Sequence, residues 1–561
     1  MLNWKHCAAS ILMTANGFVA MASRAAEEPP GAPAPPKMFL ETGIASTPVT
    51  GQTIEVGAGD DLQAALNKAQ PGDEIVLQAG STYTGNFILP VREGSGKWIT
   101  LRTSNMAGLP KEGMRVSPQD AAAMPKIVAP NANPAISTAL RAGYYRLIGL
   151  EITVAPTVKT SWAIVRLGQG GPEQTTHDVV AHHVILDRVY IHGEPKHDCF
   201  RCVALDSGSS AVIDSHLSEA HVVGFDSQAI CGVNGPGPFK IVNNYLEGSG
   251  ENIMFGGADP AIRDLVPSDI EFRGNHCFKP LSWKIGHPSY AGIPWAVKNL
   301  FELKNARRVW IEGNVFENNW VHAQNGTGIL FTVRNQSGTA PWSAVQDVTM
   351  INNRLRNSPT AFVVMGYDSP NQSQQTQRFL IRNNLFEQVE RTGFMITWGS
   401  DDVEIDHNTF VPTNYLSFVM SGLKGHDAAG QVQGVPCHRF KLTDNIFGFG
   451  RYGVGVDGGQ NTFAEAFPNS SVAKNLLVGH GEGRAEHLRK NKTLGDGFLF
   501  EPRHVGTTPE DDADWPAVEF TNFAGGDYRL TAASKYRPAG TDGNPLGADI
   551  DAIGAAVKQG Q

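Results

Sequence analysis

The residues best suited to chemistry lie in one short stretch of the chain, between Lys279 and Arg308. Cations in this stretch outnumber its single acid, Glu302; they are Lys279, Lys284, Lys298, Lys304, Arg307 and Arg308. The whole chain has a formal charge of −9, so this positively charged group contrasts with the acidic remainder of the chain. Because fixed cations focus the electrostatic field locally, such a group suits an anionic polymer even on an acidic protein.

Aromatic and imidazole side chains accompany these cations: they are Trp283, His287, Tyr290 and Trp295. Flat rings beside cations suit an acidic sugar, because the C–H groups of a sugar stack on a ring while its carboxylate binds Lys or Arg. We therefore expect substrate contacts from Lys284, His287, Tyr290 and Trp295. The alternative is a solvated loop whose rings pack on the protein itself.

Residues 295–305 are predicted to form a β-strand, because apolar and polar residues alternate there. The apolar residues fall on one face of this strand: Val297, Phe301 and Leu303. The charged residues fall on the other: Lys298, Glu302 and Lys304. Fully buried Lys and Glu are rare unless paired, so the charged face should be the outer one.

A recurring sequence phrase indicates what would hold this strand in place. A strand-like stretch ends in Asn, Asp or another polar or small residue and an apolar pair follows, at 214–217, 243–246, 274–278, 313–316, 352–355, 383–386, 407–410, 444–447 and 474–477. Successive copies lie 24 to 39 residues apart, within the period of roughly 20 to 50 residues that marks a solenoid. Asn suits the bends because it tolerates left-handed backbone, and stacked Asn side chains can bond between coils.

The repeat resembles that of the right-handed parallel β-helix proteins of the pectate-lyase-like superfamily, over most of residues 51–500. The resemblance implies an all-β solenoid with one coil per repeat, and crossovers between parallel strands favour the right hand. Residues 60–70 combine an Asp cap, apolar residues at helical spacing and a Pro-Gly stop, and predict an N-terminal capping helix. Five residues hold the same position after the repeated Asn and are therefore predicted to stack in one interior column: Phe316, Leu355, Phe386, Phe410 and Phe447.

Parallel strands lie about 4.8 Å apart, so residues of preceding coils should come beside the charged strand. The candidates are Asp226, Gln228, Glu251 and Asn252. Together they suit a polysaccharide lyase, in which a base removes the proton alpha to a uronate carboxylate while cations neutralise that carboxylate. The resemblance implies Lys or Arg as the base, often with Ca²⁺ held by acids on successive coils.

These roles fall on particular residues here, although the chain carries no complete lyase signature. We predict Lys298 or Lys304 as base, Arg307 as carboxylate clamp, Asp226, Glu251 or Glu302 as calcium ligands, and Gln228 and Asn252 as substrate contacts. A ladder of charged side chains that merely stabilises the sheet is the structural alternative. The expected partner is an acidic polysaccharide, with no nucleic-acid partner.

Two other functions compete. Ser400-Asp401-Asp402 and Gly479-His480-Gly481 are similar to two motifs of the polygalacturonases, which hydrolyse glycans with paired acids. The Asn-Thr-Asp triplet and the Arg-Ile-Lys motif expected around them are missing. Glycan binding without turnover would instead rely on exposed rings: Trp320, Trp342, Tyr367 and Trp398.

The remaining segments complete the predicted organisation. Residues 1–22 read as a secretory leader, 23–50 as a flexible Pro-rich tether, and 501–561 as a segment that closes the last coil. Loop insertions are expected near 279–300 and 319–348. The leader predicts a secreted or periplasmic protein, and we expect a monomer without a membrane span.

The chain has six cysteines, of which Cys7 lies in the leader. The other five cannot all pair within one chain: Cys199, Cys202, Cys231, Cys277 and Cys437. Buried thiols or one disulfide are the simple interpretation. A zinc site is the alternative, formed by His192, His197, Cys199 and Cys202.

Overall fold

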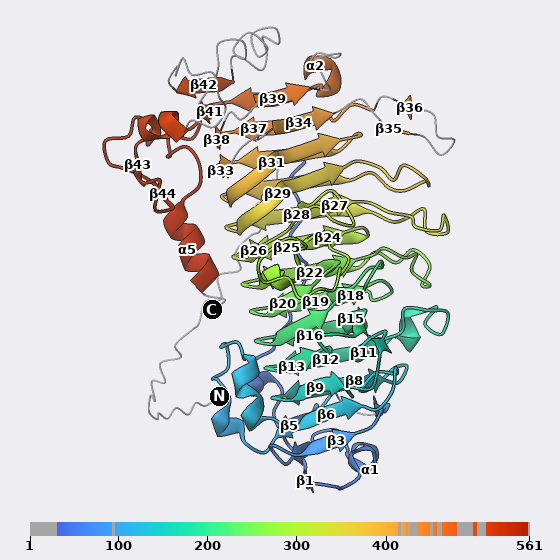
Figure 1. Cartoon of the computed structure of the whole chain (residues 1–561). Helices are drawn as coiled ribbons and strands as arrows, with labels where there is room; N and C mark the ends of the chain where they lie inside the picture. The colour runs from blue at the N-terminus through green and yellow to red at the C-terminus, as the bar shows by residue number, and fades with distance from the viewer. Residues whose placement is uncertain are drawn as a thin grey trace, which may run out of the picture. The chain divides into compact units, whose positions relative to one another are not determined.

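The structure is a computed structural model that describes residues 31–92, 96–412, 417–421, 425–426, 432–433, 435–448, 453–456, 463–478, 497–501 and 512–558. Its strands stack in parallel, coil upon coil, on three faces (Figure 1). Each coil contributes a strand to the first face, then to the second and then to the third. The predicted all-β solenoid, a parallel β-helix, is therefore confirmed.

The first face is a fourteen-stranded sheet. Its strands are β1 (Thr53–Val56), β2 (Glu74–Leu77), β5 (Ile99–Thr103), β8 (Gly143–Ile148), β12 (His182–Asp187), β16 (Gly208–Ile213), β19 (Gly237–Val242), β22 (Ser268–Arg273), β25 (Ala306–Glu312), β28 (Val345–Ile351), β30 (Gln377–Arg382), β32 (Asp401–Asp406), β37 (Lys441–Thr443) and β40 (Ser471–Ala473).

The second face follows a bend after each strand of the first face. Its strands are β3 (Thr82–Thr84), β6 (Lys126–Ala129), β9 (Glu151–Val154), β13 (Tyr190–His192), β17 (His216–Ala220), β20 (Tyr245–Gly248), β23 (His276–Phe278), β26 (Val315–Glu317), β33 (Thr409–Pro412), β38 (Ile446–Gly448), β41 (Asn475–Val478) and β42 (Phe498–Glu501).

The third face completes each coil. Its strands are β4 (Phe87–Leu89), β7 (Ile136–Thr138), β11 (Val165–Gly168), β15 (Arg201–Asp206), β18 (Gln228–Gly232), β21 (Glu251–Phe255), β24 (Phe301–Leu303), β27 (Thr327–Thr332), β34 (Ser417–Ser421) and β39 (Gly453–Val456). Two long strands, β29 (Arg354–Met365) and β31 (Leu385–Thr397), pair with strands of both the second and third faces.

Other elements lie outside these faces. They are the helices α1 (Leu62–Lys68), α2 (Phe463–Ala466) and α5 (Ile550–Lys558), the 3₁₀ helices η1 (Ile44–Ser46), η2 (Met106–Gly108), η3 (Pro118–Ala123), η4 (His177–Val179), η5 (Leu281–Trp283) and η7 (Asp512–Val518), and the strand pairs β10 (Thr160–Ser161) with β14 (Asp198–Cys199), β35 (Gly425–His426) with β36 (Val432–Gln433), and β43 (Phe520–Asn522) with β44 (Asp527–Leu530). In the part of the chain that is described, no helix has both the length and the apolar character needed to cross a bilayer.

A buried ladder of asparagines fixes the bend between the first and second faces. The amide nitrogen of each donates to the amide oxygen of the next over 2.8 to 3.1 Å, along Asn244, Asn275, Asn314, Asn353, Asn384, Asn408, Asn445 and Asn475. The residue before each of these has a left-handed φ between 50° and 64°. The repeated Asn therefore marks the bend, and the predicted bonding between coils is confirmed.

The predicted interior column is also confirmed. Sheet pairing joins Phe316 to Leu355, and then links Phe386, Phe410 and Phe447 in register. The side chains of all five are at most 1 % exposed. The rings of Phe386 and Phe410 stack with centroids 4.4 Å apart.

Helix α1 forms where the capping helix was predicted. Asp61 is its N-cap and accepts a hydrogen bond from the amide of Ala64 over 2.9 Å. Leu62, Ala65 and Leu66 are buried in the main core. Figure 1 shows the helix beside β1, at the end of the stack that β1 forms.

Residues 31–50 are not the free tether that their composition predicts. The segment runs back along the first face, and its main chain bonds to side chains of that face: Ala34 N to Asp347 Oδ1 (3.1 Å), Lys37 N to Asp269 Oδ1 (2.8 Å), Leu40 O to Lys240 Nζ (3.0 Å) and Thr42 O to Arg146 Nη1 (2.7 Å). A Pro-rich segment forms few hydrogen bonds within its own backbone. Here, charged side chains of the first face supply the partners instead. Residues 1–22, the predicted leader, lie outside the described residues.

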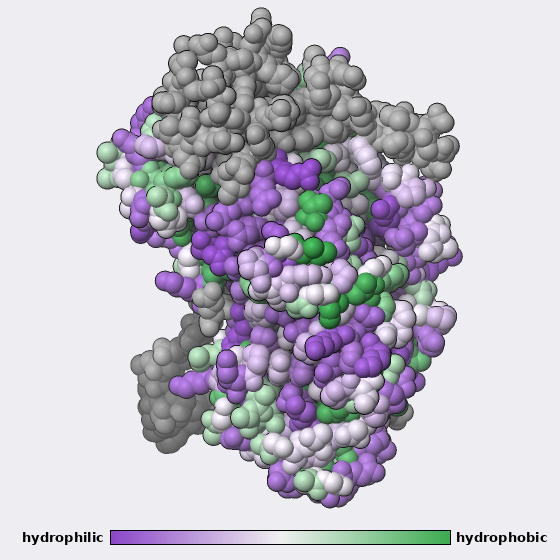
Figure 2. Space-filling view, in the orientation of Figure 1, coloured by the Kyte–Doolittle hydropathy of each residue, from purple (hydrophilic) through white to green (hydrophobic). Residues whose placement is uncertain are grey.

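The C-terminal segment packs along the second face rather than only closing the last coil. Trp515, Val518, Tyr536 and Leu546 cover outward apolar residues of β38 and β41. Farther back along the stack, Ile553 of α5 packs with Leu385 and Val411. The segment thus covers apolar side chains that would otherwise face water, as Figure 1 shows by the position of α5 beside the stack. On the face shown in Figure 2, hydrophilic residues predominate and hydrophobic ones form small separate groups.

The stacked column gives a first prediction. Replacing Phe386 by Ala should lower the free energy of unfolding by about 3 to 5 kcal/mol, because its neighbours Leu355 and Phe410 belong to fixed coils and cannot close the cavity. Denaturant unfolding measures this change. Replacing the exposed Phe39 by Ala is the control and should change stability by less than about 0.5 kcal/mol; equal losses in both variants would contradict the column's role.

Candidate functional site

Strand β24 carries the predicted alternation of buried and charged residues. Phe301 and Leu303 belong to the core, whereas Glu302 pairs with Met254 of β21 and faces outward. Lys304 follows the strand and lies over this wall, with its Nζ 3.3 Å from Oε1 of Glu302. The side chain of Glu302 is only 1 % exposed and that of Lys304 is 12 % exposed. Glu302 is therefore an outer residue that its neighbours cover.

Lys298 makes a second ion pair, at the corner that precedes the third face. Its Nζ donates to Oδ1 of Asp226, two coils earlier in the stack. Gly250 lies in the intervening coil, where a Cβ atom would meet the carbonyl oxygen of Ser227 at 2.6 Å. Both partners remain accessible, with 16 % of the Lys298 side chain and 31 % of the Asp226 side chain exposed.

Beneath these pairs lies a buried amide and carboxylate. Gln228 and Glu251 occupy paired positions on β18 and β21, and the amide of Gln228 donates to Oε2 of Glu251 over 2.7 Å. The Oε1 atom of Glu251 has no hydrogen-bond partner. Burial, and then the charge of Glu302, raise the pKa of Glu251 to about 8. Glu251 is thus mainly protonated at neutral pH, which avoids an uncompensated buried charge.

The protonation of Lys304 differs from the prediction. The sequence predicted Lys298 or Lys304 as the base, a role that requires a lysine whose pKa lies below its ordinary value. Burial does lower the pKa of Lys304, but the neighbouring acids, above all Glu302, raise it more, so the net shift is upward. Lys304 is therefore an ammonium group at neutral pH, suited to facing an anion rather than to removing a proton.

Lys279 belongs to the same basic stretch but has a structural position. It is fully buried, and its Nζ donates to the carbonyl oxygens of Gly248, Ser249 and Gly250 over 2.5 to 3.0 Å. Burial lowers its pKa to about 7, against the charge of Glu251. Three acceptors match the three donors of an ammonium group. Lys279 thereby holds the turn that leads into Glu251.

Other predicted site residues lie apart from this cluster. Arg307 lies on β25 of the first face, where Arg308, Asp347 and Asp269 are its charged neighbours, so it cannot clamp a carboxylate held at Lys304. Asn252 is fully buried, and its amide donates to the carbonyls of Leu246 and Phe278. Its role is therefore to hold backbone, not to bind substrate.

The two predicted insertions pack on each other. Trp283, Trp295, Val297 and Trp320 form a small buried cluster, and Lys284 lies over the ring of Trp320 at 6.0 Å. This contradicts the prediction that Trp295 is a free stacking ring: it stacks instead on buried His221, with centroids 3.8 Å apart.

Two of the predicted substrate contacts, His287 and Tyr290, lie at the tip of the first insertion. His287 bonds Ser289 over 2.8 Å, and Tyr290 is half-buried beside it. Within the part of the chain that the structure describes, neither forms a hydrogen bond or ion pair with the acid–lysine cluster of Asp226, Lys298, Glu302 and Lys304. Their sequence proximity to Lys298 therefore overstated their part in the site.

The sequence did not single out two members of the network. Asn299 donates to Oε2 of Glu302 and to Oε1 of Gln324, each over 3.1 Å. Arg201 occupies the position before Gln228 in the same column of β15 and β18, and its Nε donates to Oε1 of Gln228 over 3.4 Å. Both residues could have been found from the strand register, because they share a column with Glu251.

The residues of the competing functions are engaged elsewhere. Asp402 forms a two-point ion pair with Arg439, and Asp401 accepts bonds from the backbone and ring of His438. His480 lies outside the described residues. Of the rings considered for binding without turnover, Trp320 is buried, and Trp342 donates its Nε1 to the carbonyl of Leu265.

The cysteines follow the simple interpretation. All five outside the leader are free and buried. His192 contacts Glu151, and His197 contacts Lys159, so neither imidazole joins Cys199 and Cys202 in a zinc site. Among the residues described, the one group of side chains close enough for a metal lies elsewhere, at Asp406, His407 and Asp444.

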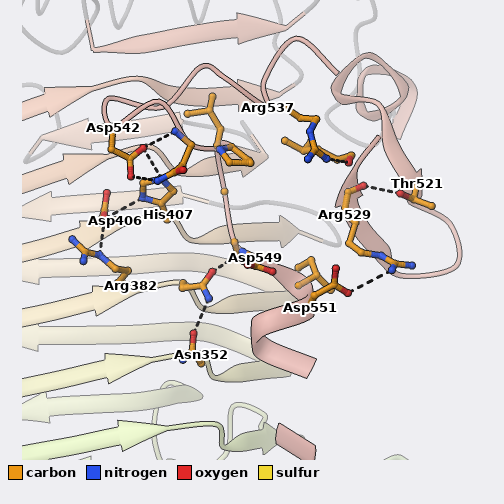
Figure 3. Close-up of a pocket in the computed structure, with 18 of the residues that line it drawn as sticks. Asn352, Arg382, Asp406, His407, Thr521, Arg529, Arg537, Asp542, Asp549 and Asp551 are labelled. Atoms are coloured by element: carbon orange, nitrogen blue, oxygen red, sulfur yellow. Dashed lines mark hydrogen bonds and ion pairs between the residues drawn. The ribbon is translucent and has the colours of Figure 1, made fainter. Parts of the chain in front are cut away.

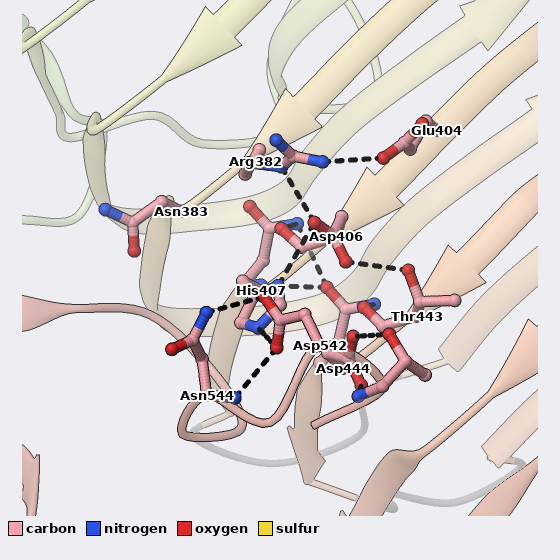
Figure 4. A network of polar contacts seen from close by, with 12 residues as sticks. Arg382, Asn383, Glu404, Asp406, His407, Thr443, Asp444, Asp542 and Asn544 are labelled. Carbon is pink, nitrogen blue, oxygen red and sulfur yellow. Dashed lines mark hydrogen bonds and ion pairs between the residues drawn. The ribbon is translucent and has the colours of Figure 1, made fainter. Parts of the chain in front are cut away.

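That second cluster lies where the C-terminal segment meets the β-helix, in a cleft of about 990 Å³ (Figure 3). Oδ2 of Asp406 accepts from Arg382 over 2.7 Å, and its Oδ1 accepts from Thr443 over 2.7 Å. Asp444 accepts two bonds from Thr541. Figure 4 shows these groups converging on His407, with Asp542 beside it.

The polar contacts of this cluster join the C-terminal segment to the β-helix. Burial lowers the pKa of His407, but the hydrogen bond and charge of Asp406 raise it above its ordinary value. A raised pKa favours the imidazolium form, which cannot ligate a metal, and the carboxylate oxygens of Asp406 and Asp444 already accept from protein donors. We therefore assign it to the attachment of residues 541–549.

The predicted calcium ligands fit a cation poorly. Asp226 is paired with Lys298, Glu302 with Lys304, and Glu251 is fully buried with a raised pKa. Across the described ranges, these three carboxylates do not converge to within 4.8 Å of one another as a ligand group would. The side chains of Lys298 and Lys304 lie beside these carboxylates, and their positive charge would repel Ca²⁺.

The comparisons with known proteins found structural likeness only. No family model and no curated protein matches the chain. The PL6 family alginate lyase AlyGC is 13% identical with a TM-score of 0.41, and the match covers 89% of this chain and 58% of that one. This chain therefore spans little more than half the length of that protein.

Two further solved structures are similar over more of their own length. A mannuronic acid specific polysaccharide family 6 lyase from human gut microbiota is 13% identical with a TM-score of 0.41, covering 81% of this chain and 92% of that one. Pectate lyase Pel9A is 13% identical with a TM-score of 0.33, covering 89% and 93%.

Lys279 gives a testable prediction. Lys279→Met keeps the length of the side chain but leaves three buried carbonyls without donors, so we expect a loss of about 3 kcal/mol or more in the free energy of unfolding. Chemical denaturation measures the loss. Lys284→Met removes a cation from the same loop at a partly exposed position and should be nearly neutral; similar stability of the two variants would refute the assignment.

Glu251 gives a prediction about pH. Its folded pKa, about 8, lies above the ordinary value of 4.5, so its proton stabilises the fold fully below about pH 4.5 and this stabilisation is lost as pH rises toward 8. Glu251→Gln keeps an acceptor for Gln228 and has no proton to lose. The melting temperature of the wild type should therefore fall more steeply between pH 5 and 8.5 than that of the variant.

The control for this comparison is Glu55→Gln at an exposed position. That variant should follow the wild type across the whole pH range. Parallel curves for wild type and Glu251→Gln would contradict the raised pKa.

Proposed function

We propose that this protein is a polysaccharide lyase that cleaves a uronate-containing glycan by β-elimination. The observation that carries the proposal is a pair of neighbouring ion pairs at the third face: Lys298 binds Asp226 from another coil, and Lys304 binds Glu302 on its own coil. This arrangement provides a fixed cation and a proton-accepting pair within one short segment. Both are requirements of elimination beside a carboxylate.

Lys304 is the group that faces the substrate carboxylate. Its pKa is raised above the ordinary value, with Glu302 as the largest raising cause, so it is an ammonium at neutral pH. Neutralising a uronate carboxylate stabilises the negative charge that develops when the neighbouring proton leaves. Glu302 and Asn299 hold the position of Lys304 from below, since Glu302 bonds both.

The Asp226–Lys298 pair accepts the proton. The C–H bond alpha to the carboxylate breaks, its electrons form the carbon–carbon double bond, and the bond to the glycosidic oxygen breaks. The carboxylate of Asp226, held by the ammonium group of Lys298, takes the proton from carbon. It returns the proton to the leaving oxygen, which keeps the electrons of the broken C–O bond, so the reaction consumes no net proton. Asp226 and Lys298 are exposed enough to reach a sugar, whereas Gln228 and Glu251 are not.

No step in this proposal passes through calcium, because the acids are already paired with lysines. Calcium dependence, which the sequence suggested, is tested by chelation with EDTA. We expect elimination to continue in EDTA, and restoration of a lost activity by added Ca²⁺ would overturn this expectation. The predicted leader supports a secreted or periplasmic location, where such glycans are met.

Substitution of the two lysines tests the proposal. Lys298→Ala and Lys304→Ala should each lower kcat/KM by about 100-fold or more, the contribution of a positioned acid–base group or fixed charge. Pectate, alginate and glucuronan are the substrates, and ultraviolet absorbance of the unsaturated uronate product is the readout. The melting temperature should change little for Lys298→Ala, because a partly exposed ion pair contributes about 0 to 1 kcal/mol. Lys304→Ala leaves the buried Glu302 unpaired and should lower the melting temperature, so its activity is measured at a temperature at which circular dichroism shows the variant folded.

The matched control is Lys441→Ala, which removes an ion-paired lysine from the first face. Its activity should equal that of the wild type. New reducing ends without ultraviolet absorbance would establish hydrolysis instead, and full activity of both lysine variants would exclude their roles. Binding without any product would favour a noncatalytic glycan-binding protein.

A further inference from the structure

Among the residues described, two arginines on the third face have no carboxylate partner. Val165 and Leu167 of β11 belong to the core, so Arg166 between them points outward. The side chain of Arg166 is half-buried and forms no hydrogen bond or ion pair with the described residues, and its Nε atom is buried without a partner. Arg201 of β15 donates to the neutral amide oxygen of Gln228 over 3.4 Å and likewise forms no ion pair with them.

Arginines on the first face show the arrangement that is missing here. Each of three forms a two-point ion pair: Arg308 with Asp269, Arg378 with Asp347, and Arg439 with Asp402. Removing a guanidinium group from water costs free energy, which a carboxylate partner offsets. A half-buried arginine that lacks such a partner is therefore suited to receive a carboxylate from a ligand.

Asp206 lies close enough to both arginines for their charges to act on its pKa, but it forms an ion pair with neither. Its Oδ1 atom accepts from the backbone amides of Val233 and Asn234, each over 2.8 Å. Burial raises the pKa of Asp206, although those amides and both arginines act in the opposite direction. Asp206 therefore does not neutralise either guanidinium group.

The coil register places Arg166 in line with the acid–lysine cluster. The outward column that begins at Arg166 continues, coil by coil, through Ala204, Cys231, Met254 and Glu302. Burial raises the pKa of the Cys231 thiol to about 11, so none of the three intervening side chains is charged at neutral pH. Arg166 is thus four coils from Glu302 and its partner Lys304, about 19 Å at about 4.8 Å per coil. Figure 1 shows β11, β15 and β18 one above another on the same side of the stack.

We propose that Arg166 and Arg201 bind carboxylates of an acidic glycan, on sugars that lie several units from the bond that is cleaved. The proposal rests on the proposed function, because it extends the same site along the third face. The spacing between coils, about 4.8 Å, is comparable to the length of one sugar unit. A chain that reaches from Lys304 to Arg166 therefore carries several further sugars. Its class is a polyuronate, because the arginines contribute only where those further sugars are charged.

Matched oligosaccharides test the proposal. Disaccharides and octasaccharides of pectate, alginate and glucuronan are the probes, each as the free acid and as the methyl ester. Calorimetry measures Kd in a Lys298→Ala background, which prevents turnover. Arg166→Gln should weaken binding of an acid octasaccharide by about 10-fold or more, the contribution of a charge-assisted pair, and should leave disaccharide binding unchanged. Arg166→Lys should recover only part of the loss, because an ammonium group lacks the planar fork of a guanidinium.

Two controls make the result specific. Arg307→Gln removes another half-buried arginine, but from the first face, and should leave binding unchanged. The methyl ester of the octasaccharide has the same length without the charge and should bind equally to the background and to its Arg166→Gln variant.

Melting temperature is a second readout. Arg166→Gln should not lower it, because no carboxylate loses a partner. Arg378→Gln should lower it, because Asp347 loses a two-point ion pair.

Several results would overturn the arginine site. They are an unchanged Kd for the acid octasaccharides in the Arg166→Gln, Arg201→Gln double variant, equal losses for acid and methyl ester, and failure to bind any acid octasaccharide. Equal affinity for an octamer of aspartate would assign the arginines to an acidic peptide instead. Elimination by the wild type is measured separately: its absence, with charge-dependent octasaccharide binding intact, would refute the proposed reaction and leave the arginine site standing.

Discussion

Register between coils is the constraint on which the rest of this structure depends, and the asparagine ladder enforces it. Asn314 and its equivalents are buried, so each amide must find partners inside the protein. Each bonds the next amide along the stack, and a shift of one residue would break this series and turn the core outward. Because of this register, Asp226, Glu251 and Lys304 meet although other segments separate them in sequence.

Competition between burial and charge sets the chemistry of the site. For Glu251, burial dominates and the carboxyl holds its proton up to about pH 8. For Lys304, burial is outweighed by nearby acids, above all Glu302, and the ammonium persists. The cluster therefore has two layers: Gln228, Glu251 and Glu302 adjust charge from within, and Lys298, Lys304 and Asp226 meet the solvent.

The sequence predicted features that follow from local periodicity. The helix at residues 60–70, the column through Phe386 and the alternation around Glu302 all depend on neighbours in the chain or on one repeated position. Arg307 shows the limit: it is three residues from Lys304, yet a bend between them sends it to another face. Only knowledge of where a strand ends could have separated the two.

Segments without periodicity were harder to interpret, for a physical reason. The backbone of residues 31–50 lies on the first face because Asp269 and Asp347 accept its amide protons, and nothing in a Pro-rich composition encodes those distant partners. Likewise Trp295 is buried by Trp283 and Trp320, whereas Trp162 and Phe225 stay exposed. Both groups consist of aromatic residues, so their exposure is decided by the three-dimensional packing of insertions onto coils and not by residue type.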